Sequence, residues 1–248
     1  MNKQPKSTPS TASDLAPSWA TSRLAQGFKD LLTRLGAFFP RILIQCIESA
    51  LHYLEGGRWM RVHGFKNFKR VSNPLEIFQW VAAQSRGSKL LYLEFGVHEG
   101  RSIAAFSKMV PDTNAIFQGF DSFVGLPERW NTFNKRGHFS TDGKMPEIED
   151  ERISFIKGWF NESLPAHMLP SHDQLFINID CDLYSSASYV LMHLMKQIKP
   201  GTYLYFDEFY DRHQEMKAFE EFLEVSGFKF ECIMSTKGLA NVLFRRIQ

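Results

Sequence analysis

Cysteine, net charge and uninterrupted apolar sequence are all scarce in this chain of 248 residues. The three cysteines form no Cys-x-x-Cys pair and no metal-ligand spacing, which favours a reducing, cytoplasmic location over a disulfide framework. A formal net charge of +2 gives no electrostatic indication of nucleic-acid binding. The longest apolar tract, residues 37–54, is broken by Pro40 and by polar residues, so it is too polar to span a membrane.

The N-terminal region lacks the pattern of a folded domain. Residues 1–20 have no apolar core of a secretory signal peptide and are rich in Ser, Thr and Pro, which predicts a disordered tail. Residues 21–70 carry apolar side chains at helical spacing and predict a helical extension. Two interpretations stay open for it. The extension packs on its own domain or on a second subunit of a homo-oligomer, or residues 24–55 make a peripheral membrane contact.

Strand-like and helical patterns alternate from residue 71 to the C-terminus, and we expect one domain over 71–248. Such alternation predicts an α/β fold, a Rossmann-like doubly wound sheet that is mostly parallel with helices on both faces. The last two strands are joined by a short polar turn and predict an antiparallel C-terminal hairpin. The seven expected strands cover residues 89–95, 115–120, 153–157, 175–179, 203–206, 228–234 and 239–245.

Acidic residues and glycines follow four of these expected strands. The turn after the first strand runs from Glu94 to Gly100, and Asp121 ends the second strand. Asp180 ends the fourth strand, and the pair Asp207-Glu208 ends the fifth. Because ligands bind beyond the carboxyl ends of the strands in open parallel sheets, these residues predict one binding site. Their acidity indicates a ligand rich in hydroxyl groups, a cation, or both.

The first turn lacks the Gly-x-Gly-x-x-Gly fingerprint of dinucleotide-binding proteins. Glu94 and Glu99 flank the turn, and their carboxylates would repel a pyrophosphate but suit a positively charged ligand. Asp121 follows about twenty residues later, where an acid accepts hydrogen bonds from ribose hydroxyls. The pattern favours S-adenosylmethionine over a nicotinamide dinucleotide, although a nicotinamide-dependent oxidoreductase remains an alternative.

The acids of the later strands have the pattern of a metal site. Asp180 and Asp182 follow one strand and Asp207-Glu208 the neighbouring one, so their charges would repel without a compensating cation. Mg²⁺ prefers such oxygen ligands and can hold and activate a substrate hydroxyl. The alternative interpretation is that some of these acids only cap helices. Between the two acidic regions, residues 122–150 form a long aperiodic segment that we expect to act as a lid.

Five strings make the sequence similar to a known family, the macrocin O-methyltransferases, within the class I S-adenosylmethionine-dependent methyltransferases. The resemblance covers roughly residues 70–246 and keeps the family's order. The strings are LEFGV at 93–97, GFDSFVGLP at 119–127, GWFNESLP at 158–165, IDCDLY at 179–184 and FDE at 206–208. The resemblance implies a seven-stranded sheet whose last strand is antiparallel.

The resemblance also implies roles for individual residues. It places the methionine end of the cofactor at Glu94 and Gly96, its ribose at Asp121, and its adenine near Gly158 and Trp159. The full expected set of cofactor-binding residues is Glu94, Gly96, Gly100, Ser102, Asp121, Ser122, Gly158, Trp159 and Asp180. The metal site it implies consists of Asp180, Asp207 and Glu208. Glu208 departs from the family, in which a second aspartate stands at this position.

The expected function is transfer of a methyl group from S-adenosylmethionine to a hydroxyl of a small molecule or glycoside, assisted by Mg²⁺. Asp180 is the expected metal ligand and proton acceptor, with His98, His138 and His213 as alternative bases. The second alternative function, besides the oxidoreductase, is a non-catalytic scaffold protein that binds the cofactor. The sequence does not identify the acceptor.

Overall fold

The computed structural model describes residues 22–131 and 133–248, which form two compact units divided after Ala50. The first unit contains α1 (Arg23–Gly36) and the start of α2 (Arg41–Val62). The Ser22 side chain caps α1 by accepting the N–H of Ala25 at 3.2 Å. The tail predicted for residues 1–20 lies outside the described residues. No helix in the described part of the chain is long and apolar enough to cross a membrane.

Apolar residues recur along α1 and the first turns of α2, and their side chains are exposed. In α1 they follow a four-three-four spacing on one face, which makes this helix strongly amphipathic. The exposed apolar residues of the first unit include Leu24, Phe28, Leu31, Leu32, Leu35, Phe38, Phe39, Ile42, Leu43, Ile44 and Ile47.

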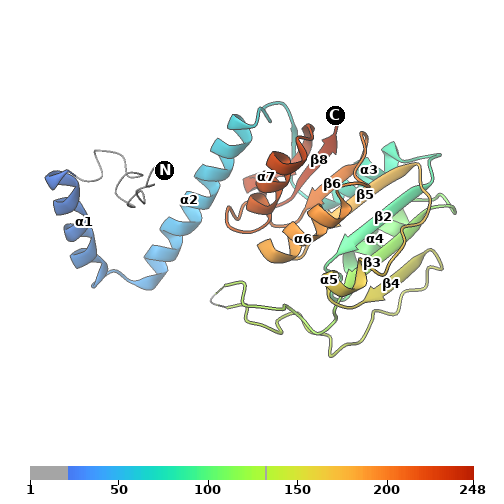
Figure 1. The fold of residues 1–248 in the computed structure, drawn as a ribbon, viewed down its shortest axis with the longest axis horizontal. Helices are drawn as coiled ribbons and strands as arrows, with labels where there is room; N and C mark the ends of the chain where they lie inside the picture. The colour runs from blue at the N-terminus through green and yellow to red at the C-terminus, as the bar shows by residue number, and fades with distance from the viewer. Residues whose placement is uncertain (1–21, 132) are drawn as a thin grey trace, which may run out of the picture. The chain divides into compact units, whose positions relative to one another are not determined.

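The second unit is built on one eight-stranded sheet with the order β1-β7-β8-β6-β5-β2-β3-β4 (Figure 1). All pairs are parallel except those of β8, which is antiparallel to both β6 and β7. The strands are β1 (Lys69–Val71), β2 (Leu90–Phe95), β3 (Ile116–Asp121), β4 (Ile153–Lys157), β5 (Gln174–Ile179), β6 (Tyr203–Phe206), β7 (Phe230–Thr236) and β8 (Val242–Arg246).

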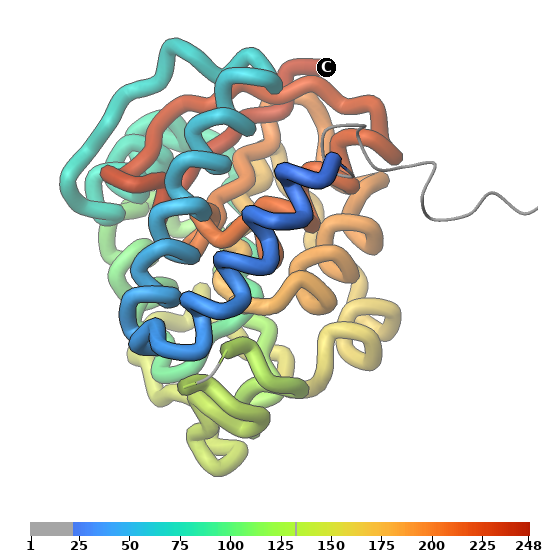
Figure 2. Tube along the Cα trace, turned by 90° about the vertical axis from the view of Figure 1, so that its left-hand side faces the viewer, coloured from blue at the N-terminus to red at the C-terminus, as the bar shows by residue number. Residues whose placement is uncertain are grey.

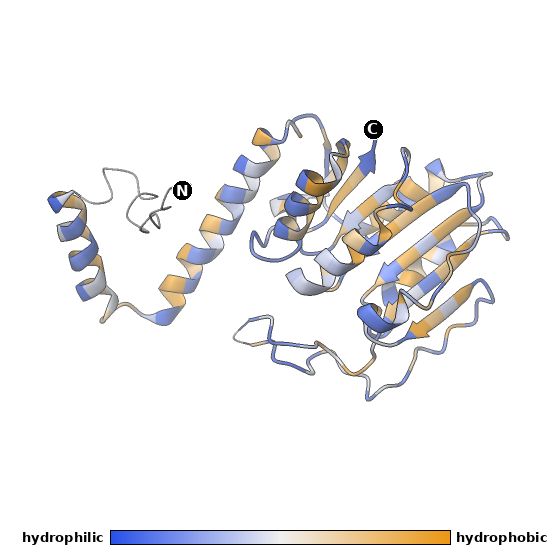
Figure 3. Cartoon of the chain, viewed as in Figure 1, coloured by the Kyte–Doolittle hydropathy of each residue, from blue (hydrophilic) through white to orange (hydrophobic). Residues whose placement is uncertain are grey.

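The predicted α/β sheet and its antiparallel hairpin are confirmed, with one additional strand. β1 pairs in parallel with β7 at the edge of the sheet. Three residues are too few to show a strand period, so β1 has no recognisable pattern in the sequence. The central strand β2 is buried along its whole length, as expected for a strand with helices on both faces. Figure 3 shows apolar residues concentrated in the strands.

Helices cover both faces of the sheet. α3 (Pro74–Gln84) and α4 (Arg101–Met109) pack with Tyr92 of β2 in one core, while α6 (Tyr184–Leu194) and α7 (Glu215–Ser226) pack with Leu93 in the other. A capping box between Asn73 and Glu76 starts α3. α5 (Phe160–Ser163) is a single turn. Figure 2 shows the same chain from a second direction.

The last turns of α2 belong to the sheet unit. Trp59 is buried there and contacts Phe209 and Phe219, with ring centroids 5.3 and 6.1 Å apart. Tyr53 stacks on Tyr210 at a centroid distance of 5.5 Å. Part of the extension predicted for residues 21–70 therefore packs against the segment that follows β6.

Candidate active site

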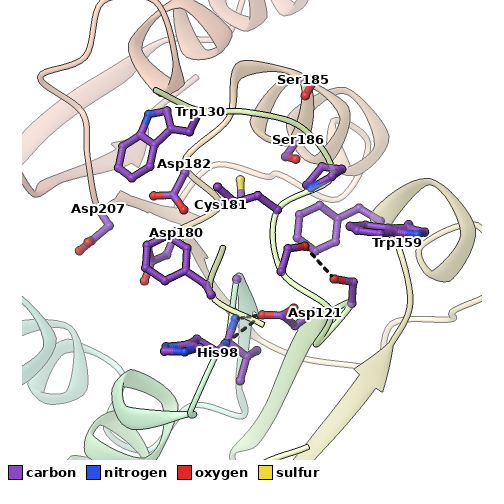
Figure 4. Close-up of a pocket in the computed structure, with 18 of the residues that line it drawn as sticks. His98, Asp121, Trp130, Trp159, Asp180, Cys181, Asp182, Ser185, Ser186 and Asp207 are labelled. Atoms are coloured by element: carbon purple, nitrogen blue, oxygen red, sulfur yellow. Dashed lines mark hydrogen bonds between the residues drawn. The ribbon is translucent and has the colours of Figure 1, made fainter. Parts of the chain in front are cut away.

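A cavity of about 730 Å³ lies at the carboxyl ends of the central strands (Figure 4). The turns after β2, β3, β4, β5 and β6 line it, together with part of the segment after β3. Every cofactor and metal residue predicted from the sequence lines this cavity except Glu94 and Gly100. Those that do are Gly96, Ser102, Asp121, Ser122, Gly158, Trp159, Asp180, Asp207 and Glu208. Of the three alternative bases, His98 lines it, whereas His138 and His213 do not.

Gly96 brings two of these turns into contact. Its φ is +95°, and a Cβ atom at this position would lie 1.7 Å from the backbone oxygen of Asp180. No side chain fits this approach, and an L residue would also be strained at that φ. The glycine therefore lets the turn after β2 lie directly against the turn after β5.

Asp121 holds the glycine turn in place. Its Oδ2 atom accepts the backbone N–H groups of Val97 at 2.8 Å and His98 at 2.9 Å, and Oδ1 accepts the N–H of Phe123 at 2.7 Å. A carboxylate offers about four lone-pair positions, so roughly one remains for a ligand. The bonds to Val97 and His98 fix the backbone of a turn in which His98 has a left-handed φ of 50°.

Glu94 lies beneath the cavity rather than in its wall. Its side chain is fully buried and accepts hydrogen bonds from the hydroxyls of Tyr92 and Ser102 and from Asn178 Nδ2, the last two at 2.8 and 3.3 Å. Burial raises the pKa of Glu94 to about 7. Ser102 lines the cavity, so the Ser102 hydroxyl links the buried Glu94 to the cavity. Gly100, with a φ of +73°, starts α4.

The acidic end of the cavity holds four carboxylates from two neighbouring turns. They are Asp180 and Asp182 after β5, and Asp207 and Glu208 after β6. Burial and the charge of Asp207 raise the pKa of Asp180 well above its usual range. Burial and the charges of Glu208 and Asp207 raise the pKa of Asp182 to about 7. Among the described residues, no Lys or Arg forms an ion pair with any of the four. Their mutual repulsion is therefore met by protonation unless a cation binds.

Neutral donors support the two acids that follow β6. Tyr205 and Asn241 both donate to Asp207 Oδ1, at 2.9 and 2.6 Å. Tyr210 donates to Glu208 Oε2 at 3.0 Å. These donors carry no signal in the sequence, because tyrosines and an asparagine near strand ends have ordinary structural roles. The same holds for Glu215, a fully buried acid at the first position of α7.

The donor chemistry and the geometry of the acidic end give different indications about a metal. Buried carboxylate oxygens are the ligands that Mg²⁺ prefers. Nevertheless, within residues 22–131 and 133–248 no three His, Cys, Asp or Glu side chains form a group that could hold an ion. A cation would have to draw the carboxylates together.

The described residues of the segment after β3 form part of the cavity wall. Leu126 and His138 lie side by side, since the N–H of Leu126 donates to the His138 oxygen at 2.9 Å. A hydrogen bond of 2.6 Å from Ser185 to Glu128 ties the segment to the start of α6. This part of the chain lies at the lower edge of the view in Figures 1 and 2. It adds aromatic side chains to the cavity, among them Trp130 and Phe139.

The fold is shared with solved methyltransferase structures. The O-methyltransferase NovP is similar with a TM-score of 0.57 and 20% identity, covering 70% of this chain and 79% of that one. The calicheamicin methyltransferase CalS11 is similar with a TM-score of 0.50 and 15% identity, covering 98% and 99%. Likeness at this level of identity establishes the architecture alone.

The sequence comparisons establish the family. The model of the macrocin O-methyltransferase (TylF) family matches residues 93–245. The chain therefore belongs to this family of S-adenosylmethionine-dependent O-methyltransferases. A curated relative from Streptomyces olivaceus, an 8-demethyl-8-(2,3-dimethoxy-alpha-L-rhamnosyl)-tetracenomycin-C 4'-O-methyltransferase, is 28% identical over 181 residues. The match covers 63% of this chain and 66% of the relative, so the chain spans just under two thirds of the relative's length.

Proposed function

We propose that the protein methylates a hydroxyl group of a small molecule or glycoside, using S-adenosylmethionine with the assistance of a divalent cation. One observation carries the proposal: a single cavity joins the turn of Gly96 and Asp121 to four carboxylates that have no Lys or Arg partner among the described residues. The first end has the chemistry to hold a nucleoside, and the second has the chemistry to hold a cation and a hydroxyl.

The cofactor residues divide by the part of S-adenosylmethionine that they would contact. The remaining lone-pair position of Asp121 suits a ribose hydroxyl, and the Trp159 ring beside Gly158 offers an apolar surface for adenine. Asp180 would face the positively charged methionine end. Gly96 has no side chain, so it would let that end approach the backbone of the turn after β2 closely. Ser102 would position Glu94 toward the same end, and Ser122 completes the wall near Asp121.

Asp180, Asp207 and Glu208 would hold Mg²⁺, and Asp180 would also receive the acceptor's proton. When bound, the cation would keep these acids ionised and lower the pKa of the acceptor hydroxyl. The acceptor oxygen attacks the methyl carbon, the bond from that carbon to the sulfonium sulfur breaks, and S-adenosylhomocysteine leaves. Positioning of the two reactants and exclusion of water provide much of the rate enhancement.

A glycoside acceptor is supported by the relative from Streptomyces olivaceus, whose name describes methylation of a rhamnosyl group. The aromatic side chains Trp130 and Phe139 give the cavity an apolar wall against which a sugar ring can pack.

The test combines binding with turnover. We expect S-adenosylhomocysteine, and not NAD, to raise the unfolding midpoint, because the acidic turn after β2 suits a cationic ligand. We also expect methyl transfer to a hydroxyl in a panel of glycosides only when Mg²⁺ is present. Stabilisation by NAD alone would support the oxidoreductase instead. Cofactor binding without turnover on any acceptor would support a scaffold protein.

A further inference from the structure

Glu215 connects the two turns that carry the acidic residues. It is the first residue of α7, and its side chain is fully buried. Its Oε1 atom accepts the backbone N–H of Cys181 at 3.4 Å, and its Oε2 atom accepts the N–H of Glu208 at 3.3 Å. One carboxylate thus contacts the peptide that follows Asp180 and the peptide of Glu208 itself.

The sheet no longer holds these turns together where Glu215 contacts them. The register of β5 and β6 ends at Ile179 and Phe206, and one further bond joins the N–H of Asp207 to the oxygen of Ile179 at 3.0 Å. Beyond this point the turn after β5 leaves regular geometry, and Asp182 adopts a φ of 62°. The spacing of the two turns therefore depends on contacts from outside the sheet.

A glutamate is chemically suited to this position. Both of its contacts are with N–H donors, and a carboxylate accepts at both oxygens whereas an amide accepts at only one. Burial and the charges of Asp207 and Asp182 raise the pKa of Glu215 well above its usual range, so the two contacts do not depend on a fixed negative charge. The preceding residue adds a third contact to the same turn, because Gln214 Oε1 accepts the N–H of Tyr184 at 2.7 Å.

We propose that Glu215 is a positioning residue that sets the spacing between the turn of Asp180 and the turn of Glu208, and thereby the cation affinity of the acidic end. The proposal extends the proposed function, since it assumes that this end binds a divalent cation. Glu215 contacts neither acceptor nor cofactor in this scheme and acts through the two backbone amides.

The experiment compares Glu215→Gln with Glu224→Gln, a change at an exposed position of the same helix. Hydrogen exchange at single amides, followed by NMR in metal-free protein, should show Cys181 or Glu208 losing protection in Glu215→Gln only. Calorimetry should show S-adenosylhomocysteine affinity unchanged within about threefold, because Asp121 and Gly96 are not altered. The Mg²⁺ concentration at half-saturation, read from the thermal shift, should rise by about tenfold, because an amide at this position leaves one of the two backbone N–H groups without its acceptor.

The outcomes separate this proposal from the function on which it rests. Unchanged protection of both amides would overturn the positioning role, whatever the metal result. Lost protection with unchanged Mg²⁺ affinity would overturn the effect on the cation. Wild-type protein that binds no Mg²⁺ would refute the metal part of the proposed function, and the exchange data would still decide whether Glu215 joins the turns. If Glu215→Gln does not fold, Glu215→Asp is used, which keeps both oxygens but shortens their reach, and the same readouts apply.

Discussion

The two ends of the cavity satisfy their acidic residues in opposite ways. At the end formed by β2 and β3, Asp121 accepts three backbone N–H groups from its own turn and its neighbour. At the end formed by β5 and β6, four carboxylates lie on two neighbouring turns, and burial raises the pKa of Asp180 and Asp182. The first end is complete without a ligand, whereas the second end needs protons or a cation.

This difference shows how one cavity can bind two reactants with separate requirements. Backbone donors fix the Asp121 side chain before any ligand binds, so under the proposed function little ordering would be needed when a nucleoside arrives. The carboxylates of the acidic end instead repel one another when no cation is bound, so a cation that binds there should stabilise the protein. Changes at the first end should therefore affect fold and cofactor binding, and changes at the second should affect catalysis and pH dependence.

Gly96→Ala should have the largest effect, because it breaks the contact between the two ends. The new Cβ would meet the Asp180 backbone oxygen 1.7 Å away. We expect a loss of about 4 kcal/mol or more in the free energy of unfolding, measured by urea denaturation. Gly57→Ala is the matched control, since no atom lies within 4 Å of a Cβ there and the glycine lies within α2. Equal stability of the two variants would refute the argument.

Chelation should have the next largest effect and act on the acidic end alone. Excess EDTA should lower methyl transfer by about a hundredfold or more, since a bound metal contributes several kcal/mol to such reactions. S-adenosylhomocysteine affinity should stay nearly intact. Asp207→Asn should reproduce the effect of EDTA, while Glu208→Asp, which restores the family's acid pair, should keep or improve activity. Full activity in EDTA would leave Asp180 as a plain general base.

Asp121→Ala should weaken cofactor binding by about ten- to a hundredfold, the range for a hydrogen bond to a charged acceptor. It should also lower stability, because three backbone N–H groups lose their acceptor at once. Glu162→Ala is the control, as Glu162 also lines the cavity but is exposed. Calorimetry and thermal unfolding measure both effects. Wild-type affinity for S-adenosylhomocysteine would remove Asp121 from the cofactor site.

A smaller effect is expected in residues 122–150, the segment that we expect to act as a lid. The expected lid should gain protection from hydrogen exchange when cofactor saturates the protein, most of all around Trp130. The hydrogen bond from Ser185 to Glu128 already ties the segment to α6. Ser185→Ala should therefore increase exchange in this segment without changing the core. Unchanged protection with saturating cofactor would indicate a fixed wall.

The sequence predicted the sheet and most of the cavity for a physical reason. Apolar strand runs that end in Asp or Gly place those residues at one sheet edge, whatever the details of packing. What it could not predict depends on contacts between distant segments. Glu94 ends an apolar run as Asp180 does, but it has hydroxyl partners that hold it beneath the cavity. Glu215 has the pattern of an ordinary first-turn acid, and only the fold brings it to Cys181 and Glu208.

The pH dependence of stability should be the smallest of these effects. It distinguishes Asp182 at the acidic end from Glu94 at the other end. The pKa of Asp182 rises from 3.8 to about 7, and that of Glu94 from 4.5 to about 7. Each group is protonated when folded and ionised when unfolded between these values, so the free energy of unfolding should fall as pH rises through that window and level off above it. In EDTA the unfolding midpoint should thus be several degrees lower at pH 8 than at pH 5. At pH 8, Mg²⁺ should restore the part of the lost stability that is due to Asp182 and leave the part that is due to Glu94. An equal effect of Mg²⁺ at both pH values would show that the cation does not displace protons from the acidic end.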